Sequence, residues 1–238
     1  FIPVARLTDM LEQPGGTYEY DGQQLRYPDV RLVYWAGGNP FHHHQDLNRL
    51  LRAWRKPESV IVHEQVWNPL AKLADVVLPA TSTLEREDIG FAYREPLVVA
   101  MRQVDAPPGE ARDDHAIFAA IAERMGFGAE FTAGRSAREW QAFMWEEWRS
   151  GLASTGIEPP SFDEFRNAGA WRLPEATQPV VMLEEFRRDP AAHPLATPSG
   201  RIEIHSERIA AFGYDDCPGH PSWLEPVDWP GSPLARDC

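Results

Sequence analysis

The sequence predicts an α/β protein: a Rossmann-like parallel sheet with flanking helices, followed by an irregular, Pro-rich C-terminal arm. Two observations predict the sheet. Short apolar segments alternate with amphipathic helical segments over residues 30–151. In addition, a strand, a helix and a second strand follow one another within about 30 residues, as in a βαβ unit. The arm is predicted because residues 155–199 are rich in Pro and aromatic residues and have weak periodicity.

These observations divide the chain into three parts. Residues 1–29 are a lead-in segment, and residues 30–151 are expected to form the Rossmann-like domain. Residues 152–238 form the arm, which we expect to pack on this domain or on domains outside the sequence. Within the arm the sequence predicts three short elements: a helix near residues 162–167, a strand at 201–206 and a helix at 207–213.

The predicted strands are short and apolar. Residues 31–36 end at a glycine pair, and residues 59–64 form a continuous apolar run of the kind found in buried parallel sheets. Two further strands are expected at residues 75–80 and 96–104, with a short segment around residues 70–73 before the first of these. The sheet would therefore hold four strands.

The predicted helices carry clear start and stop signals. Residues 46–56 place three leucines and a tryptophan at i, i+3, i+4 and i+7, which gives one apolar face. A second helix spans residues 113–125 and ends at Gly126, a typical C-terminal cap. A third, at residues 136–151, opens with an S-x-x-E capping box.

The composition limits the partners of the chain. It has 36 acidic and 23 basic residues, a formal net charge of −13, which argues against nucleic acid or an anionic membrane as partner. No run of about 18 apolar residues occurs, so no transmembrane helix is expected. The two cysteines, Cys217 and Cys238, form no disulfide framework or CxxC motif. Because the sequence lacks an initiating Met, we expect it to be part of a longer protein.

Two features follow the first predicted strand: a glycine turn, Gly37-Gly38, and a run of three histidines, 42–44. Adjacent residues point in different directions, whereas one metal ion needs ligands that converge, so we expect no metal site. The turn lies where parallel strands end, which is where nucleotides bind, and glycine lets a ligand approach the backbone. Amides that open the helix after His44 could meet a phosphate. A turn without a ligand is the alternative.

Polar residues follow the other strands at the same predicted edge. His63 and Glu64 end the second strand, where a carboxylate can accept hydrogen bonds from ribose hydroxyls or from a base. Arg86, after the third strand, could reach a base or a phosphate. Asp114 begins a helix, and its carboxylate is either an N-cap or an acceptor of two N–H groups from a guanine edge, which adenine cannot supply.

Seven segments stand in a characteristic order: IPVARLTDML, YWAGGNPFHHHQDLNRLLRAW, VIVHE, ADVVLPATSTLERED, EARDDHAIF, HPLATPSGRIEIHS and GYDDCPGHPSWLEP. In this order they resemble the dimethyl sulfoxide reductase family, bacterial molybdenum oxidoreductases that carry two molybdopterin guanine dinucleotides. The resemblance extends through nearly the entire chain. It departs from the family at Glu64, where the family usually has Asp, and in the altered segments 63–75 and 85–96.

The resemblance implies that residues 30–151 are mostly one of the family's two dinucleotide-binding domains, which holds one of the two dinucleotides of the molybdenum cofactor. Gly38 and Asn39 would contact the cofactor beside His43 and Gln45, and Asp114 would contact the guanine. The full set of implied cofactor residues is Gly37, Gly38, Asn39, His43, Gln45, His63, Glu64, Arg86 and Asp114. No catalytic residue is implied, because the side chain that binds molybdenum in the family lies before this stretch.

The resemblance also implies a parent enzyme that reduces a small S-oxide or N-oxide by two-electron oxygen-atom transfer, with the remaining domains of that enzyme as partners. It favours a cytoplasmic enzyme over a periplasmic one. The isolated chain is expected to be inactive. Two alternatives remain open: a nicotinamide- or adenine-nucleotide-binding Rossmann domain, and a non-catalytic interaction module that uses the nine tryptophans.

Overall fold

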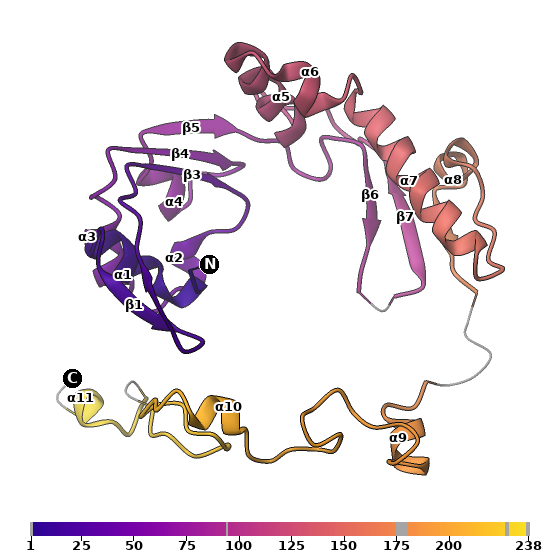
Figure 1. Cartoon of the computed structure of the whole chain (residues 1–238). Coiled ribbons are helices and arrows are strands. Elements are labelled where there is room, and N and C mark those ends of the chain that lie inside the picture. The colour runs from indigo at the N-terminus through magenta and orange to yellow at the C-terminus, as the bar shows by residue number, and fades with distance from the viewer. Residues whose placement is uncertain (1, 94, 175–179, 227–228, 237–238) are drawn as a thin grey trace. The chain divides into compact units, whose positions relative to one another are not determined.

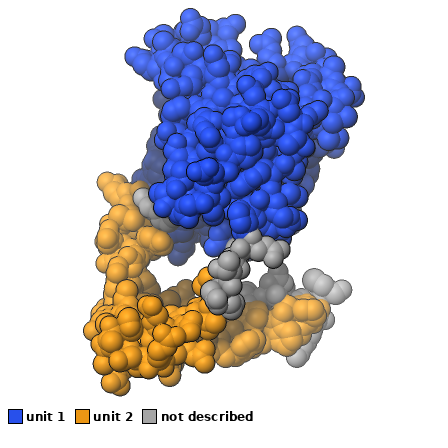
Figure 2. Space-filling model, turned by 90° about the vertical axis from the view of Figure 1, so that its right-hand side faces the viewer, with its two compact units in different colours: residues 1–16, 27–177 blue, residues 17–26, 178–238 orange. Residues whose placement is uncertain are grey.

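The computed structural model of the chain describes residues 2–93, 95–174, 180–226 and 229–236. The chain forms two compact units, coloured separately in Figure 2. The first unit comprises residues 1–16 and 27–177, and the second comprises residues 17–26 and 178–238. The first unit therefore extends beyond residue 151, the end that we predicted for the dinucleotide-binding domain.

The first unit contains a parallel sheet of three strands (Figure 1). Its strands are β3 (Leu32–Ala36), β4 (Ser59–Glu64) and β5 (Val76–Pro79), in the order β3-β4-β5. Val60 and Val62 of the central strand are buried. The parallel sheet that the sequence predicts is thus confirmed, with strand ends within one residue of those expected.

Short helices connect these strands and cover the sheet. α2 (Pro40–His43) and α3 (Leu47–Ala53) lie between β3 and β4, and α4 (Pro69–Lys72) lies between β4 and β5. The apolar face predicted for residues 46–56 packs inward, since Leu50 and Trp54 are buried in one hydrophobic cluster with the sheet. The helix begins with Asp46, whose carboxylate accepts the Arg49 N–H at 3.0 Å.

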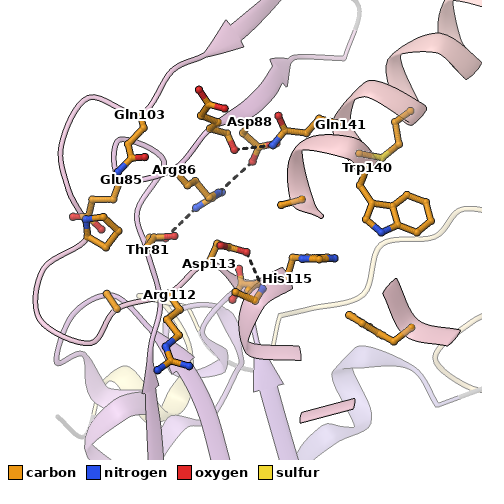
Figure 3. A pocket seen from close by; sticks show the side chains of 18 residues that line it. Thr81, Glu85, Arg86, Asp88, Gln103, Arg112, Asp113, His115, Trp140 and Gln141 are labelled. Atoms are coloured by element: carbon orange, nitrogen blue, oxygen red, sulfur yellow. Dashed lines mark hydrogen bonds and ion pairs between the residues drawn. The ribbon is translucent and has the colours of Figure 1, made fainter. Parts of the chain in front are cut away.

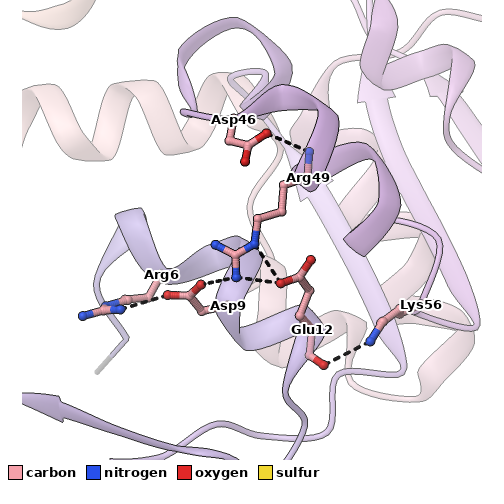
Figure 4. A network of polar contacts seen from close by, with 6 residues as sticks. All are labelled: Arg6, Asp9, Glu12, Asp46, Arg49 and Lys56. Carbon is pink, nitrogen blue, oxygen red and sulfur yellow. Dashed lines mark hydrogen bonds and ion pairs between the residues drawn. The ribbon is translucent and has the colours of Figure 1, made fainter. Parts of the chain in front are cut away.

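A charged network joins α3 to the N-terminal helix α1 (Leu7–Glu12), which follows the 3₁₀ turn Val4–Arg6 (Figure 4). The Arg49 guanidinium donates to Asp9 at 2.6 Å and to Glu12 at 2.6 and 2.8 Å. Lys56 donates to the backbone carbonyl of Glu12 at 3.0 Å. One arginine therefore holds two carboxylates of the neighbouring helix, a geometry that suits its planar fork of donors.

A second sheet in the first unit is antiparallel. It has the order β6-β7-β8, with β6 at Asp88–Phe91, β7 at Leu97–Met101 and β8 at Ala170–Arg172. The strand expected at residues 96–104 therefore exists as β7, but it is not a fourth strand of the parallel sheet. It pairs with β6, which the sequence reading missed, because the short connection between the two favours a hairpin and leaves no room for a crossover helix.

Three longer helices complete the first unit. α5 (Asp114–Met125) ends at Gly126 in the left-handed conformation, and α7 (Ala137–Ala153) begins with a capping box formed by Ser136 and Glu139, as predicted. A shorter helix, α6 (Gly128–Thr132), lies between them. The helix expected near residues 162–167 is α8 (Phe162–Ala168), which packs on α7. Its Phe165 ring stacks on Trp145 at 3.9 Å, and both are buried.

The second unit contains the hairpin of β1 (Thr17–Tyr20) and β2 (Gln23–Arg26), which the sequence reading missed. Within this unit, the hairpin loop binds the arm through an Asp21–Arg208 ion pair at 2.6 Å and a hydrogen bond from the Gly22 N–H to the Tyr214 hydroxyl at 3.0 Å. The short helices of this unit that the structure describes are α9 (Glu184–Arg188), α10 (Glu207–Ala210) and α11 (Pro233–Arg236).

The strand expected at residues 201–206 is wrong, although the helix expected at residues 207–213 begins as α10. Local side-chain bonds occupy this backbone instead. The Thr197 hydroxyl donates to the Arg201 carbonyl at 2.6 Å, and the Ser199 N–H donates to Glu203 at 2.8 Å. Because such bonds compete with ladder formation, the alternating apolar pattern does not produce a strand here. No helix among the described residues is long and apolar enough to cross a membrane.

Candidate functional site

The carboxyl ends of β3, β4 and β5 meet at one edge of the parallel sheet, since the three strands run in the same direction. A short backbone pairing brings the start of α5 to this edge. The Arg112 N–H donates to the Pro79 carbonyl at 3.1 Å, and the Thr81 N–H donates to the Arg112 carbonyl at 3.1 Å. Residues that lie far apart in the sequence are thus joined where each strand ends, which is where α/β sheets bind ligands.

The glycine turn at the end of β3 is open toward its surroundings. Gly37 and Gly38 have φ angles of 85° and 72°, which favour glycine, and no described atom lies within 4 Å of a Cβ placed on either residue. The buried Asn39 side chain accepts the Phe41 N–H at 2.9 Å and so caps α2. The first helix after the turn therefore begins at Pro40, before the position expected after His44.

The histidine run lies in and after α2. The His43 and His44 rings are 5.1 Å apart, and burial, followed by the charge of His43, lowers the pKa of His44. His43 and Gln45, both predicted to lie beside the cofactor, are exposed. In the part of the chain that the structure describes, no group of three or more His, Cys, Asp or Glu residues is placed to hold a metal ion.

His63 and Asp114 form the closest polar contact at the sheet edge. His63 Nδ1 lies 2.6 Å from Asp114 Oδ1, and His63 Nε2 lies 2.7 Å from the Tyr34 hydroxyl. The His63 side chain is 1% exposed, whereas that of Asp114 is 54% exposed. Asp113, not Asp114, is the N-cap of α5, since its carboxylate accepts the Ala116 N–H at 2.8 Å. The Asp114 carboxylate is therefore not used by the cap and faces a pocket.

This pocket, with a volume of about 770 Å³, lies between the segment after β5, the start of α5 and helix α7. Figure 3 shows Arg86 held between the Thr81 carbonyl, at 3.0 Å, and the Asp88 carboxylate, at 3.3 Å. Trp140 of α7 lies on the opposite side from Thr81. The charged residues that line the pocket are Glu85, Arg86, Glu87, Asp88, Arg112, Asp113 and Asp114.

Two buried polar atoms of this lining have no hydrogen-bond partner among the described residues: the Thr81 hydroxyl and His115 Nε2. Leaving a buried polar group unpaired costs about 1–3 kcal/mol. Such groups are usually satisfied by a ligand or by ordered water. Both atoms therefore mark positions at which a polar ligand would recover hydrogen bonds.

The structure brings together part of the predicted set. Arg86 and Asp114 line the pocket, and His63 lies against Asp114. The remaining predicted residues lie on the glycine turn, on α2 and after it, or at the end of β4, and do not line this pocket; they are Gly37, Gly38, Asn39, His43, Gln45 and Glu64.

The sequence reading missed Thr81, Asp113, His115 and Trp140 as pocket residues. Thr81 directly follows β5 at the ligand-binding edge, so its position was a usable signal. His115 is adjacent to the predicted Asp114. Trp140, in contrast, lies on α7 and joins the pocket lining only in the folded chain, so no local pattern reveals its position there.

Residues 12–124 match the family model described as molybdopterin oxidoreductase. The match includes the parallel sheet, the glycine turn and the start of α5. These residues form a molybdopterin oxidoreductase domain, and this family implies a molybdenum–molybdopterin cofactor. The resemblance proposed from the ordered sequence segments is thus confirmed.

Curated relatives and a solved structure agree with this placement. The chain is 47% identical to biotin sulfoxide reductase of Cereibacter sphaeroides, over 100% of the chain and 32% of the relative. It is 46% identical to the dimethyl sulfoxide/trimethylamine N-oxide reductase of Rhodobacter capsulatus, over 99% and 29%. Acetylene hydratase from Pelobacter acetylenicus has a TM-score of 0.54 at 25% identity, over 89% of this chain and 26% of that one. The chain therefore spans about a third of the length of the curated relatives that it matches.

Proposed function

We propose that the carboxyl edge of the parallel sheet holds one guanosine arm of a molybdopterin guanine dinucleotide, with the base in the pocket beside Asp114. The observation that carries the proposal is the exposed Asp114 carboxylate, held by His63 in a pocket that also contains two unpaired polar atoms, on Thr81 and His115. The cofactor-binding domain is then residues 30–151, as the resemblance implies, together with the later segments that pack on it.

The charge of the pocket supports a base there and argues against a pyrophosphate. Five carboxylates and two guanidinium groups line it, an excess of negative charge that repels phosphate. A guanine edge instead offers adjacent N–H donors, which a carboxylate accepts with both oxygens. Adenine lacks this pair of donors. The pocket therefore suits the base end of a guanine nucleotide.

The phosphates would lie toward the glycine turn. The open space over Gly37 and Gly38 lets a bulky anion approach the backbone amides. The residues present fit a guanine dinucleotide. The glycine turn is open, the pocket holds unpaired polar atoms, and the exposed Asp114 carboxylate is available for the base. Asn39, His43, Gln45 and Glu64 are assigned to the same cofactor on the basis of the resemblance.

The parent protein, we propose, reduces a small S-oxide or N-oxide, as the names of the relatives of this chain suggest. The molybdopterin cofactor, when bound, supplies two-electron oxygen-atom transfer, and the protein binds and orients it. The partners of this chain would be the remaining domains of the parent, and the isolated chain would not turn over oxides. The similarity to biotin sulfoxide reductase favours a cytoplasmic parent over a periplasmic one.

Calorimetric titration of the 238-residue chain with GDP, ADP and NAD tests the binding assignment. We expect GDP to bind with a Kd of roughly 0.1–1 mM, as suits part of a larger site, and Asp114→Asn to weaken it about tenfold or more. Asp113→Asn is the matched control. It keeps a good N-cap in the same pocket and is expected to bind GDP like the wild type.

Two results would contradict the assignment. Equal binding of ADP or NAD and GDP would favour a nicotinamide- or adenine-nucleotide domain. Equal losses for the Asp113 and Asp114 variants would mean that GDP binding does not depend specifically on contact of the Asp114 carboxylate with guanine.

A further inference from the structure

Three side chains from three elements form a continuous hydrogen-bonded chain beneath the pocket. Tyr34 lies on β3, His63 on β4 and Asp114 at the start of α5. His63 bridges the other two, at 2.7 Å to the Tyr34 hydroxyl and 2.6 Å to Asp114 Oδ1. Ala36 of β3 pairs with His63 of β4, so the two side chains project from the same face of the sheet. Tyr34 stands two residues before Ala36 and therefore projects from that face too, diagonally beside His63.

The partners fix where the protons lie. A carboxylate only accepts hydrogen bonds, so His63 Nδ1 carries a proton and donates it to Asp114. In the neutral ring Nε2 is then an acceptor, and the Tyr34 hydroxyl donates to it. Burial, and secondly the charge of Asp114, raise the pKa of Tyr34 above its ordinary value of 10.0. The hydroxyl therefore stays protonated at neutral pH.

Aromatic packing prevents the His63 ring from turning. The Tyr34 ring meets it edge-on at 5.3 Å, and the Phe118 ring lies 4.8 Å from it. Phe118 stands four residues after Asp114 on α5, so both project from one face of the helix. The imidazole is thus held between the sheet and α5 in a fixed orientation, with its side chain 1% exposed.

We propose that His63 is a positioning residue for Asp114 and that it does not itself touch the nucleotide. Its Nδ1–H holds one carboxylate oxygen, and the Tyr34 hydroxyl occupies the other ring nitrogen. This inference rests on the proposed role of Asp114 toward guanine. A carboxylate held in one orientation has less rotational freedom to lose when a base binds, so removing the support weakens binding without removing a ligand contact.

Two substitutions at position 63 separate positioning from simple space filling. The amide nitrogen of Asn is attached to Cγ, like Nδ1, whereas that of Gln is attached to Cδ, one atom further along the side chain. Only His63→Asn places a donor where Nδ1 donates to Asp114. We expect His63→Asn to bind GDP within about threefold of the wild type, and His63→Gln to bind about tenfold more weakly. Equal losses, or no loss in either variant, would overturn the proposal.

An NMR measurement on the ligand-free chain makes the test independent of nucleotide binding and of folding losses at position 63. The imidazole ¹⁵N shifts of His63 should show a protonated Nδ1 and an unprotonated Nε2. Tyr34→Phe, which removes only a hydroxyl, should keep Nδ1 protonated, because the Asp114 carboxylate still accepts that proton. If the wild type shows a protonated Nε2 and a bare Nδ1, the proposal is wrong. If the chain binds no GDP, the proposed function fails, while the tautomer still decides whether His63 donates to Asp114.

Discussion

At the scale of single residues, backbone conformation and not crowding limits which residue can stand at position 37. The space around Gly37 is open, so a larger side chain would meet no neighbouring atom. Its φ of 85° strains any residue with a Cβ. We expect Gly37→Ala to lower the free energy of unfolding by about 1–2 kcal/mol. Gly151→Ala is the matched control. It also meets open space, but it lies in helix α7 without a positive φ, so Ala should raise stability by about 0.5–1 kcal/mol. Urea denaturation measures both; a change of the same sign would contradict the account.

The sequence predicts individual site residues only where local order determines them. The glycine turn and the start of α5 follow from residues beside a strand and a helix, so Gly37 and Asp114 could be singled out. Which of two adjacent aspartates caps α5 depends on the exact first residue of the helix, and the structure assigns the cap to Asp113. The contribution of Trp140 depends on tertiary packing of α7, which no local pattern contains.

At the scale of elements, the capping box of α7 gives a pH-dependent prediction. The Ser136 backbone N–H, and then its hydroxyl, donate to Glu139 and lower the pKa of that carboxyl below its ordinary 4.5. A carboxyl group whose pKa is lower in the folded chain stabilises the fold at any pH above its ordinary pKa. This contribution is lost as the pH falls through the lowered pKa. Glu139→Gln should therefore reduce the stability of the chain at pH 7, and the loss should shrink as the pH falls below 4.5 toward the lowered pKa. Glu147→Gln, on the same helix, is the control, with little effect at any pH. A loss for Glu139→Gln that stays constant as the pH falls would contradict this prediction.

The contact between α1 and α3 gives a second prediction at this scale. Burial, the largest single influence, raises the pKa of Asp9, but hydrogen bonds from Arg6 and Arg49 outweigh it and lower that pKa. Because Arg49 holds two carboxylates, we expect Arg49→Met to cost about 1 kcal/mol of stability or more. Arg31→Met breaks a well-exposed single pair with Glu58 and should cost less than about 0.5 kcal/mol. Denaturation in urea, which adds no salt that would screen ion pairs, measures the stability of both variants. Equal losses for Arg49→Met and Arg31→Met would rule out a special role for the contacts of Arg49 with Asp9 and Glu12.

Elements with local signals were predictable, and elements that depend on distant partners were not. The capping box of α7 and the cap at Gly126 are encoded within a few residues. The pairing of β7 with β6 and β8 is set by contacts with segments outside the parallel sheet. The pattern at residues 201–206 alternates like a strand, yet local side-chain bonds hold it irregular.

At the scale of the whole molecule, the chain spans about a third of the length of the curated relatives that it matches. The described part of its second unit leaves large apolar side chains exposed, among them Ile202, Ile204 and Trp223. The ordered sequence segments predicted the family because they are distributed over nearly the whole chain. The arrangement of the arm was not predictable, since its short elements lack a hydrophobic period of their own.

The central claim is that the pocket at the carboxyl edge of the parallel sheet binds guanine. An amide NMR titration of the ¹⁵N-labelled chain with GDP and with ADP tests it most directly, because it locates binding as well as detecting it. The account predicts that GDP shifts the amides of Thr81, Asp114 and His115, while ADP at equal concentration leaves them in place. Shifts from GDP that lie away from this edge, or identical shifts from ADP, would contradict it.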